Sequence, residues 1–417
     1  MSEPGTPRRT WVQVILVCVF IGTTQMTWGV VVPALPLYAS TFDASPALLG
    51  VIVAAFSVGR LMVNIPAGLL VQRVAPRPLL VGVGLALAAL TSVTGLIDSL
   101  PVLLAARVLA GILGGAAVTI GMTVLTEWAP ESQRGRVLAT AQAVQIGGAA
   151  AGPVLGGFTL VLSNITVTFV VAAVPVLLCV VAVLLVRSPA FWSGLRPGPS
   201  IVPQGATRPV AAPAGFALAF AGLNVVGFAI FFTRFGGDQS LIPLLAYDIG
   251  GLNPASFGLV AGVATALSLL VLPVVARLLD RGWRLKLMIP TMVTASAVML
   301  FYPTATNPVL FAAVMLVTTV LNGVGTLVPS VILADITPRG RVGFAVGVSR
   351  TVGDLGATIG PIALGLAMSA GGAVPAVLLL SASSVIAIVI YLALARVAAT
   401  RANAAELVQQ PRGTLPA

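Results

Sequence analysis

Residues 165–186 read ITVTFVVAAVPVLLCVVAVLLV and contain no charged side chain. A segment of about 20 mostly apolar residues is long enough to cross the hydrocarbon core of a bilayer as an α-helix. Lipid offers no hydrogen-bond partner to an open backbone, so every crossing segment must be helical. The same criterion, applied outward from this segment, predicts twelve spans at about 11–38, 46–70, 78–97, 100–128, 136–162, 165–186, 214–247, 254–279, 286–304, 308–334, 342–369 and 372–395.

Composition excludes the main alternatives to a membrane protein. Hydrophobic residues make up 58% of the 417 residues and charged residues only 8%, whereas a typical soluble chain is about 25% charged. Intrinsic disorder needs low hydrophobicity and high charge. Two cysteines in apolar runs, Cys18 and Cys179, exclude a disulfide scaffold, and the lack of histidine removes the commonest zinc ligand and general base. We therefore predict an all-α polytopic membrane protein with no metal site and no cofactor.

The basic residues indicate orientation rather than nucleic-acid binding. The net charge is +11, but binding to nucleic acid would require basic residues clustered on one solvated face. Of the 22 basic residues, 18 lie in the N-terminus, the tail and the loops that follow even-numbered spans, while the opposite loops hold Asp43, Asp98 and Asp248 and no basic residue. This positive-inside pattern predicts a multi-pass protein of the cytoplasmic (inner) membrane with both termini in the cytoplasm.

A linker divides the chain into two copies of one unit. Residues 187–213 combine arginines with six prolines, which is typical of a semi-rigid linker. We expect a six-helix bundle at 1–186, the cytoplasmic linker at 187–213, a second six-helix bundle at 214–396 and a cytoplasmic tail at 397–417. A shift of 208 positions superimposes eight landmarks: Pro46 on Pro254, Gly50 on Gly258, Arg73 on Arg281, Glu127 on Asp335, Pro130 on Pro338, Gly135 on Gly343, Gly152 on Gly360 and Pro153 on Pro361. Twelve helices in two pseudo-symmetric bundles are a common architecture of secondary transporters, with the substrate site at the midplane.

Three further motifs accompany the repeat. Residues 68–77 read GLLVQRVAPR, with Gly68, Gln72 and Arg73 in a G-x-x-x-D-R-x-G-R-R/K pattern that has Gln72 in place of Asp and Ala75 in place of Gly. The second copy keeps the acid as Asp280 before Arg281. In the fourth predicted span, Arg107, Gly111 and Gly114 match R-x-x-x-G-x-x-G. In the fifth, residues 148–157 read GAAAGPVLGG and match G-x-x-x-G-P-x-x-G-G through Gly148, Gly152, Pro153, Gly156 and Gly157.

On these motifs the chain resembles the major facilitator superfamily over residues 11–396, and within it the twelve-span drug:proton antiporters. The resemblance implies that the acid of the first motif holds one conformation against a helix of the other half, a role that the uncharged Gln72 weakens. It implies that Arg107 takes part in proton relay. A position near the helix end, from which the side chain reaches water, is the alternative. It also implies that the bent, glycine-lined fifth span serves export at the interface of the halves.

Ionisable groups inside spans are the candidates for proton coupling. Asp354 lies near the centre of the eleventh predicted span, Arg350 precedes it by four residues, and Arg60 lies near the centre of the second. The resemblance implies that these two spans are neighbours. Our hypothesis is that Arg60 and Arg350 compete for Asp354 and that protonation of Asp354 weakens the link between the halves. A static ion pair that only helps the helices to assemble is the alternative.

Other polar residues are candidates for the substrate cavity. Arg234 and Asp238 form a four-residue pair in the seventh predicted span, for a charged substrate, an outer gate or a pair at the membrane–water boundary. Trp28 suits an aromatic or cationic ligand, although a lone tryptophan in a span is more often a packing residue or an interface anchor. The remaining cavity candidates are Gln25, Gln142, Gln145, Asn224 and Asn322.

Glu127 and Asp335 occupy equivalent positions at the cytoplasmic ends of their spans. We expect them to pair with loop arginines such as Arg134 and Arg339, in a structural role. The whole pattern predicts a monomeric transporter that exports small lipophilic or amphipathic compounds in exchange for protons. Uptake or exchange of a metabolite is the first alternative, and a non-transporting receptor or lipid-handling protein the second. An enzyme is disfavoured, because the chain has no nucleotide-binding loop, no histidine and no cluster of metal ligands.

Overall fold

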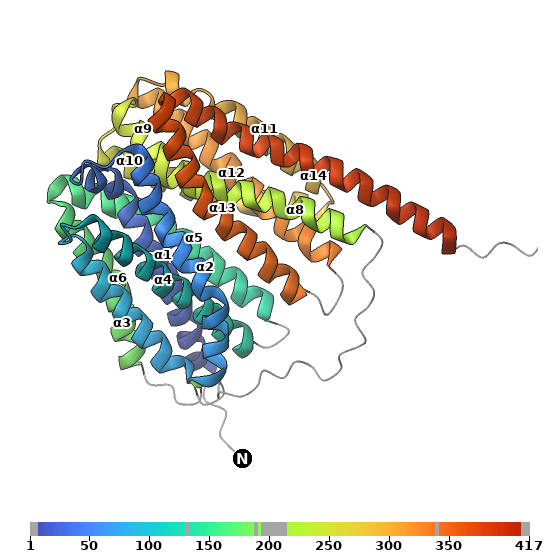
Figure 1. The fold of residues 1–417 in the computed structure, drawn as a ribbon. Helices are drawn as coiled ribbons and strands as arrows, with labels where there is room; N and C mark the ends of the chain where they lie inside the picture. The colour runs from blue at the N-terminus through green and yellow to red at the C-terminus, as the bar shows by residue number, and fades with distance from the viewer. Residues whose placement is uncertain (1–6, 130–132, 187–190, 193–214, 338–341, 410–417) are drawn as a thin grey trace, which may run out of the picture.

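The computed structural model describes residues 7–129, 133–186, 191–192, 215–337 and 342–409. Within them, twelve helices are long and apolar enough to cross a membrane, and no strand occurs. The N-terminal bundle consists of α1 (Pro7–Ser40), α2 (Pro46–Arg73), α3 (Pro76–Thr94), α4 (Leu100–Trp128), α5 (Arg134–Leu162) and α6 (Ile165–Leu185). The C-terminal bundle consists of α8 (Phe216–Phe231), η1 (Phe232–Leu241), α9 (Ile242–Asp248), α10 (Pro254–Asp280), α11 (Arg284–Met299), η2 (Tyr302–Thr304), α12 (Pro308–Ile336), α13 (Val342–Gly371) and α14 (Ala373–Gln409). Figure 1 shows the two bundles side by side.

Capping residues set where several helices begin. The side chains of Ser45, Asn164 and Asn307 each accept a hydrogen bond from a backbone N–H of the first turn that follows. Asn253 and Ser256 form a reciprocal capping box at the start of α10. Such caps satisfy amide groups that would otherwise lack a partner. A proline follows directly in α2, α10 and α12, where its missing N–H costs nothing.

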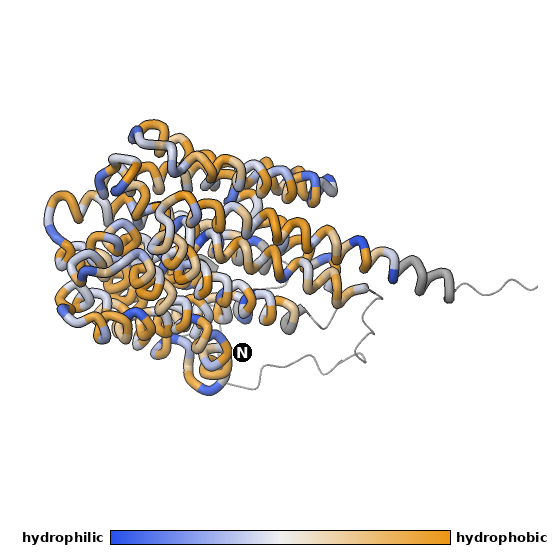
Figure 2. The backbone as a smooth tube through the Cα atoms, turned by 45° about the horizontal axis from the view of Figure 1, so that its top comes forward, coloured by the Kyte–Doolittle hydropathy of each residue, from blue (hydrophilic) through white to orange (hydrophobic). Residues whose placement is uncertain are grey.

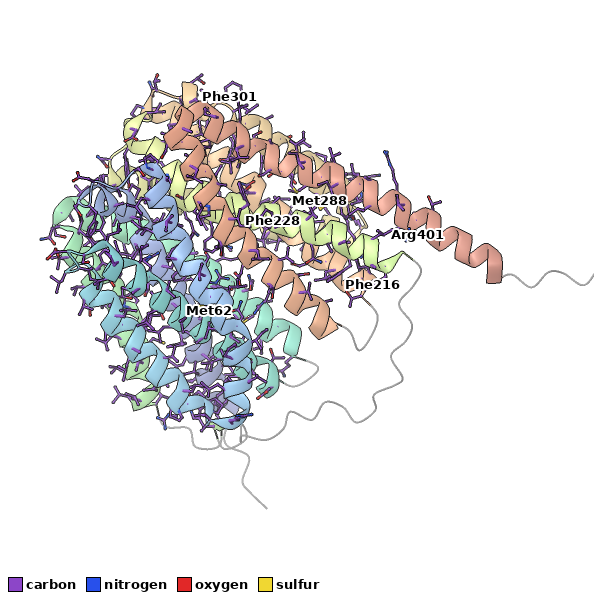
Figure 3. The ribbon with its side chains drawn as sticks, in the orientation of Figure 1. Met62, Phe216, Phe228, Met288, Phe301 and Arg401 are labelled. Atoms are coloured by element: carbon purple, nitrogen blue, oxygen red, sulfur yellow. The ribbon has the colours of Figure 1, made fainter. Side chains whose placement is uncertain are left out.

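The seventh and the twelfth span differ from the prediction, the seventh in helix type and the twelfth in length. The seventh passes from α8 into η1, a π-helical segment of 10 residues, before α9 completes the crossing. The twelfth continues past its predicted end at residue 395, because α14 is 37 residues long and ends at Gln409. At 1.5 Å per residue this helix is about 55 Å long, against a hydrocarbon core of about 30 Å. Its last part therefore extends beyond the other helices (Figure 1), and Arg401 points away from them (Figure 3).

The outward-facing surface of the bundles is apolar, as a lipid environment requires. Side chains such as Leu162, Leu185 and Val309 are 81%, 75% and 77% exposed, and hydrophobic colouring runs along most helices in Figure 2. A soluble monomer rarely exposes so large an apolar surface. The protein is therefore a multi-pass membrane protein.

The halves meet along two seams related by the internal repeat. In the first, α2 packs against α13, and a side chain at Gly50 would collide with the carbonyl oxygen of Pro361. In the second, α10 packs against α5, and a side chain at Gly258 would collide with the carbonyl oxygen of Pro153. These are the same positions 208 residues apart. Glycine lets the backbones approach closely, so the halves are held together at the end where α2 and α10 begin.

The halves diverge toward the other end. Figure 1 shows the C-terminal end of α2 and the N-terminal end of α13 moving apart. Side chains on these ends are solvent-accessible, among them Met62 at 59% and Val346 at 40%. The halves therefore lie farther apart at the end that carries the chain termini than at the seams.

Candidate functional site

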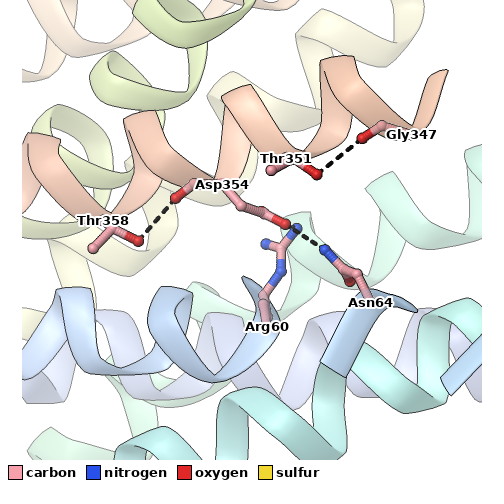
Figure 4. A network of polar contacts seen from close by, with 6 residues as sticks. All are labelled: Arg60, Asn64, Gly347, Thr351, Asp354 and Thr358. Atoms are coloured by element: carbon pink, nitrogen blue, oxygen red, sulfur yellow. Dashed lines mark hydrogen bonds and ion pairs between the residues drawn. The ribbon is translucent and has the colours of Figure 1, made fainter. Parts of the chain in front are cut away.

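An ion pair joins the two halves where α2 crosses α13 (Figure 4). A guanidinium nitrogen (Nη2) of Arg60 lies 3.0 Å from the Oδ1 atom of Asp354, and the side-chain amide of Asn64 donates a 2.6 Å hydrogen bond to Oδ2. Asp354 is only 1% exposed. Removing one partner of a buried pair leaves an uncompensated charge in a medium of low dielectric. Arg60 and Asn64 therefore tie α2 to α13, and one half to the other, at this carboxylate.

Two residues beside the ion pair bear on its geometry: a glycine that leaves room for Arg60, and Asn64, which the sequence analysis did not predict. Gly115 of α4 lies against the Arg60 side chain, where a larger residue would crowd it. Asn64 was not among the predicted site residues. It lies one helical turn after Arg60, on the same face of α2, and this spacing was the available signal.

Arg350 does not share the carboxylate with Arg60. Its side chain is exposed and makes no ion pair or hydrogen bond within the described residues. It is nevertheless close enough to interact electrostatically with both Arg60 and Asp354. Competition between the two arginines remains a prediction, since the present arrangement contains only the pair with Arg60.

Arg107 is enclosed by aromatic rings. It is 3% exposed, so the alternative that it reaches water at the helix end is wrong. Its guanidinium carbon lies 4.5 Å from the ring centroid of Trp28 and 5.4 Å from that of Phe56. It borders a small cavity of about 30 Å³ inside the N-terminal bundle. Its Nε and Nη2 atoms have no hydrogen-bond partner among the described residues, so cation–π attraction is its main compensation.

Trp28 connects the halves through Gln239, a residue that the sequence reasoning missed. The indole Nε1–H donates a 2.8 Å hydrogen bond to Oε1 of Gln239 in η1. The indole ring stacks on Phe56 at 4.0 Å between centroids. Trp28 therefore has a packing role and a polar role at once. The polar run around Gln239, within an otherwise apolar span, was the signal that pointed to it.

Arg234 and Asp238, the pair predicted from four-residue spacing, both lie in η1. No salt bridge joins them, because η1 is π-helical and its hydrogen bonds step five residues rather than four. Side chains four residues apart then no longer lie directly above one another. Arg234 is exposed and Asp238 half-buried. Arg234 and Asp238 still interact electrostatically, and Arg234 also interacts electrostatically with Arg60.

The remaining cavity candidates lie in different surroundings. Asn224 is 8% exposed and donates to the backbone oxygen of Phe220, so it is committed to the interior of its bundle. Asn322 is half-buried, and its amide nitrogen has no partner among the described residues. Gln25 and Gln145 are half-buried and Gln142 is exposed.

The fifth-span motif packs against both halves. Gly148, Gly152 and Gly156 face the backbone of α1, at Gly22, Gly29 and Val30. Gly157 faces Pro254 of the other half, next to the contact of Pro153 with Gly258. A single motif thus fixes α5 within its bundle and to its neighbour.

The loop motifs show a different ion pair from the expected ones. Asp335 pairs with Arg284 of α11, whereas the predicted partner Arg339 lies outside the described residues, as does the side chain of Arg134. Glu127 is exposed.

The loop motif of residues 68–77 and its second copy form no ion pair with the other half among the described residues. The side chains of Arg73, Asp280 and Arg281 are exposed. A side chain added at Gly68 would meet no atom within 4 Å, and the side chain of Gln72 lies outside the described residues. Among the described residues, no cluster of three or more potential metal ligands occurs.

The fold matches that of known transporters. A bacterial homolog to the human lysosomal transporter Spinster, in an inward-facing and unoccupied conformation, superimposes with a TM-score of 0.73 at 16% identity over 94% of this chain and 98% of that chain. The inward-open xylose transporter XylE from E. coli gives a TM-score of 0.71 at 15% identity over 92% and 95%. These likenesses concern the fold.

In sequence, the quinolone resistance protein NorA of Staphylococcus aureus (strain MRSA252) is 24% identical over 162 residues, 39% of this chain and 42% of that protein. The match therefore spans less than half of that relative. The family model of the Major Facilitator Superfamily matches residues 17–328 and 225–416. This chain is a transporter, not an enzyme, and belongs to the Major Facilitator Superfamily.

Proposed function

We propose that the protein exports small lipophilic or amphipathic organic compounds across the cytoplasmic membrane by proton antiport. The observation that carries the proposal is the buried ion pair of Arg60 and Asp354, which belong to different halves. Asp354 is the proton carrier. A proton added to its carboxylate removes the negative charge that holds Arg60, and the guanidinium stays charged.

The contacts at the two seams determine how the halves move after Asp354 is protonated. The glycine–proline contacts at Gly50 and Gly258 hold one end of the halves together, so the molecule is open toward the other end. Loss of the ion pair weakens a link that lies beyond those contacts, and the halves rock about the central region to expose the opposite side. The two open states differ in whether Asp354 is ionised, which couples proton movement to substrate movement.

Export is favoured over uptake by two observations. The glycines and proline of residues 148–157 form the signature typical of the exporter branch, and they pack α5 against both α1 and α10. The partial likeness to a quinolone resistance protein points the same way. The residues packed at the centre of the molecule, among them Trp28, Phe56 and Phe235, are mostly aromatic and apolar, and such surroundings suit an amphipathic compound better than a sugar.

The test begins with expression in a strain stripped of its own exporters, followed by a broad toxicity screen with and without a protonophore. A compound against which the protein protects is then followed in inside-out vesicles. We expect accumulation that needs a pH gradient and disappears in Asp354→Asn. The control is Asp43→Asn, an exposed loop carboxylate with a positive φ of 50° that asparagine tolerates. Full gradient-driven accumulation by Asp354→Asn would refute the coupling scheme, and expulsion of the compound from the vesicles would establish uptake instead.

A further inference from the structure

Arg107 is a buried cation whose own bundle supplies no counter-charge. Its side chain is 3% exposed, and neither salt bridge among the described residues includes it. The helices of the N-terminal bundle carry one acidic residue, Glu127, which lies about 30 Å farther along α4. Asp98, just before α4, is exposed, and Asp354 of the other half is paired with Arg60. Because buried charges in proteins are ordinarily paired, the anion that Arg107 lacks must come from outside the chain.

The aromatic rings beside Arg107 compensate its charge only in part. The guanidinium carbon lies 4.5 Å from the ring centroid of Trp28 and 5.4 Å from that of Phe56. A ring attracts a cation through its quadrupole but carries no net charge, and the N–H donors of a guanidinium point outward in its own plane. The Nε and Nη2 atoms of Arg107 are buried and have no hydrogen-bond partner among the described residues. These donors are therefore available to an acceptor.

The small cavity inside the N-terminal bundle offers space for that acceptor. Arg107 lines it together with Trp28, Phe56, several threonines and aliphatic side chains, and its lining includes no acidic residue. The volume of the cavity is about 30 Å³. A water molecule needs about 10–15 Å³ by this measure, so the space holds about two waters or one halide ion.

The threonine hydroxyls that line the cavity are of two kinds. Those of Thr24, Thr27 and Thr94 donate hydrogen bonds to backbone carbonyl oxygens. Thr91 is 6% exposed, and its hydroxyl makes no hydrogen bond among the described residues. Thr91 and Arg107 both line the cavity. One neutral donor and one charged donor therefore border the same small space.

We propose that this cavity binds a single monovalent inorganic anion, which is chloride under cellular conditions. The chloride accepts hydrogen bonds from the guanidinium of Arg107 and the hydroxyl of Thr91, and it supplies the negative charge that the surrounding helices lack. Water molecules would satisfy the donors but leave the charge uncompensated, which is costly in a medium of low dielectric. Sulfate and organic carboxylates exceed the volume of the cavity. The chloride site is therefore separate from the one that holds the transported compound.

Bromide locates the ion directly, because it resembles chloride in charge and size and gives an anomalous X-ray signal. Crystals of the full-length protein grown in sodium bromide should show an anomalous difference peak inside the cavity, within hydrogen-bond distance of Arg107 and Thr91. Crystals of Arg107→Gln should show no peak there. A wild-type cavity that lacks this peak, or that contains only water, would overturn the proposal.

Stability gives a second measurement, in solution. An anion that binds only the folded protein raises the unfolding midpoint as its concentration rises. Protein purified in sodium gluconate is titrated with sodium chloride at constant ionic strength, and the midpoint is read by thermal unfolding in detergent. We expect chloride and bromide to raise the midpoint above its value in gluconate. Equal midpoints in chloride and gluconate would contradict binding.

Matched variants assign the effect to the site. Arg107→Gln should abolish the chloride-dependent rise, whereas Arg401→Gln, at an exposed position of α14, should retain it. Thr91→Val keeps Arg107 and nearly the same shape, and it should raise the chloride concentration needed for a given rise about tenfold, since one hydrogen bond to the ion is lost. Its control is Thr94→Val, because that hydroxyl is already bonded to a backbone oxygen. If Arg107→Gln does not fold, the comparison of Thr91→Val with Thr94→Val decides. A full chloride response in Arg107→Gln, or an unchanged one in Thr91→Val, would overturn the assignment.

Discussion

Gly50 of α2 lies so close to the carbonyl oxygen of Pro361 in α13 that the two helices touch through their backbones. The same contact recurs between Gly258 and Pro153, where α10 meets α5. Both contacts lie at the end where the halves are closed, so the closed state depends on the absence of a side chain at two equivalent positions.

Gly50→Ala should weaken this closure. Its methyl group would meet backbone atoms that cannot move independently, and overpacking of this kind costs about 1–3 kcal/mol. Thermal unfolding in detergent should show a lower midpoint, and Gly258→Ala should reproduce the effect. The control is Gly82→Ala in α3, where a side chain meets no atom within 4 Å. Equal midpoints for Gly50→Ala and Gly82→Ala would contradict the close contact.

Arg60→Gln should destabilise the protein more than the combined variant Arg60→Gln/Asp354→Asn. The single change leaves the Asp354 charge buried without its cation, which costs about 3–5 kcal/mol. The second change removes that charge, and the asparagine can still bond to Asn64. Unfolding midpoints of both single variants and the double variant form a cycle that isolates the interaction. Additive losses would mean that the two residues do not act on each other.

Trp28→Phe should loosen the contact between α1 and η1 without removing the aromatic stack on Phe56. The lost hydrogen bond to Gln239 contributes about 0.5–1.5 kcal/mol. Gln239→Ala should have a similar effect, and the double variant should be no worse than the single ones. The initial rate of transport and the unfolding midpoint both report this. If Gln239→Ala behaves like the wild type, the bond contributes nothing to the link between the halves.

Asp335→Asn should change stability little. The pair with Arg284 is exposed, with side chains 40% and 39% accessible, and such pairs contribute about 0–1 kcal/mol. The small loss should shrink further in about 1 M salt, where the screening length is only about 3 Å. Comparison with Asp354→Asn in the same salt series separates an exposed pair from a buried one. A large loss of stability in Asp335→Asn that persists in high salt would show that this pair stabilises the protein more than its exposure indicates.

The membrane spans were predictable because apolar length and the 208-residue repeat are visible in the sequence. The pairing of Arg60 with Asp354 depended on the resemblance, which made the second and eleventh spans neighbours. Asn64 and Gln239 were missed because nothing in the sequence tells which turn of one helix meets which turn of another. The lack of a salt bridge between Arg234 and Asp238 could not be predicted from their spacing, since a π-helical segment has no sequence signature comparable to a cap or a proline.

The matched seams also bear on how such a chain is put together. Position 50 of the first unit meets position 361 of the second, and the equivalent position 258 of the second meets the equivalent position 153 of the first. That reciprocity defines an isologous interface, the kind formed by two identical subunits around a two-fold axis. A free-standing six-helix unit with the same glycine and proline would thus find its complement in another copy of itself. The tandem protein keeps the geometry of a homodimer within one polypeptide.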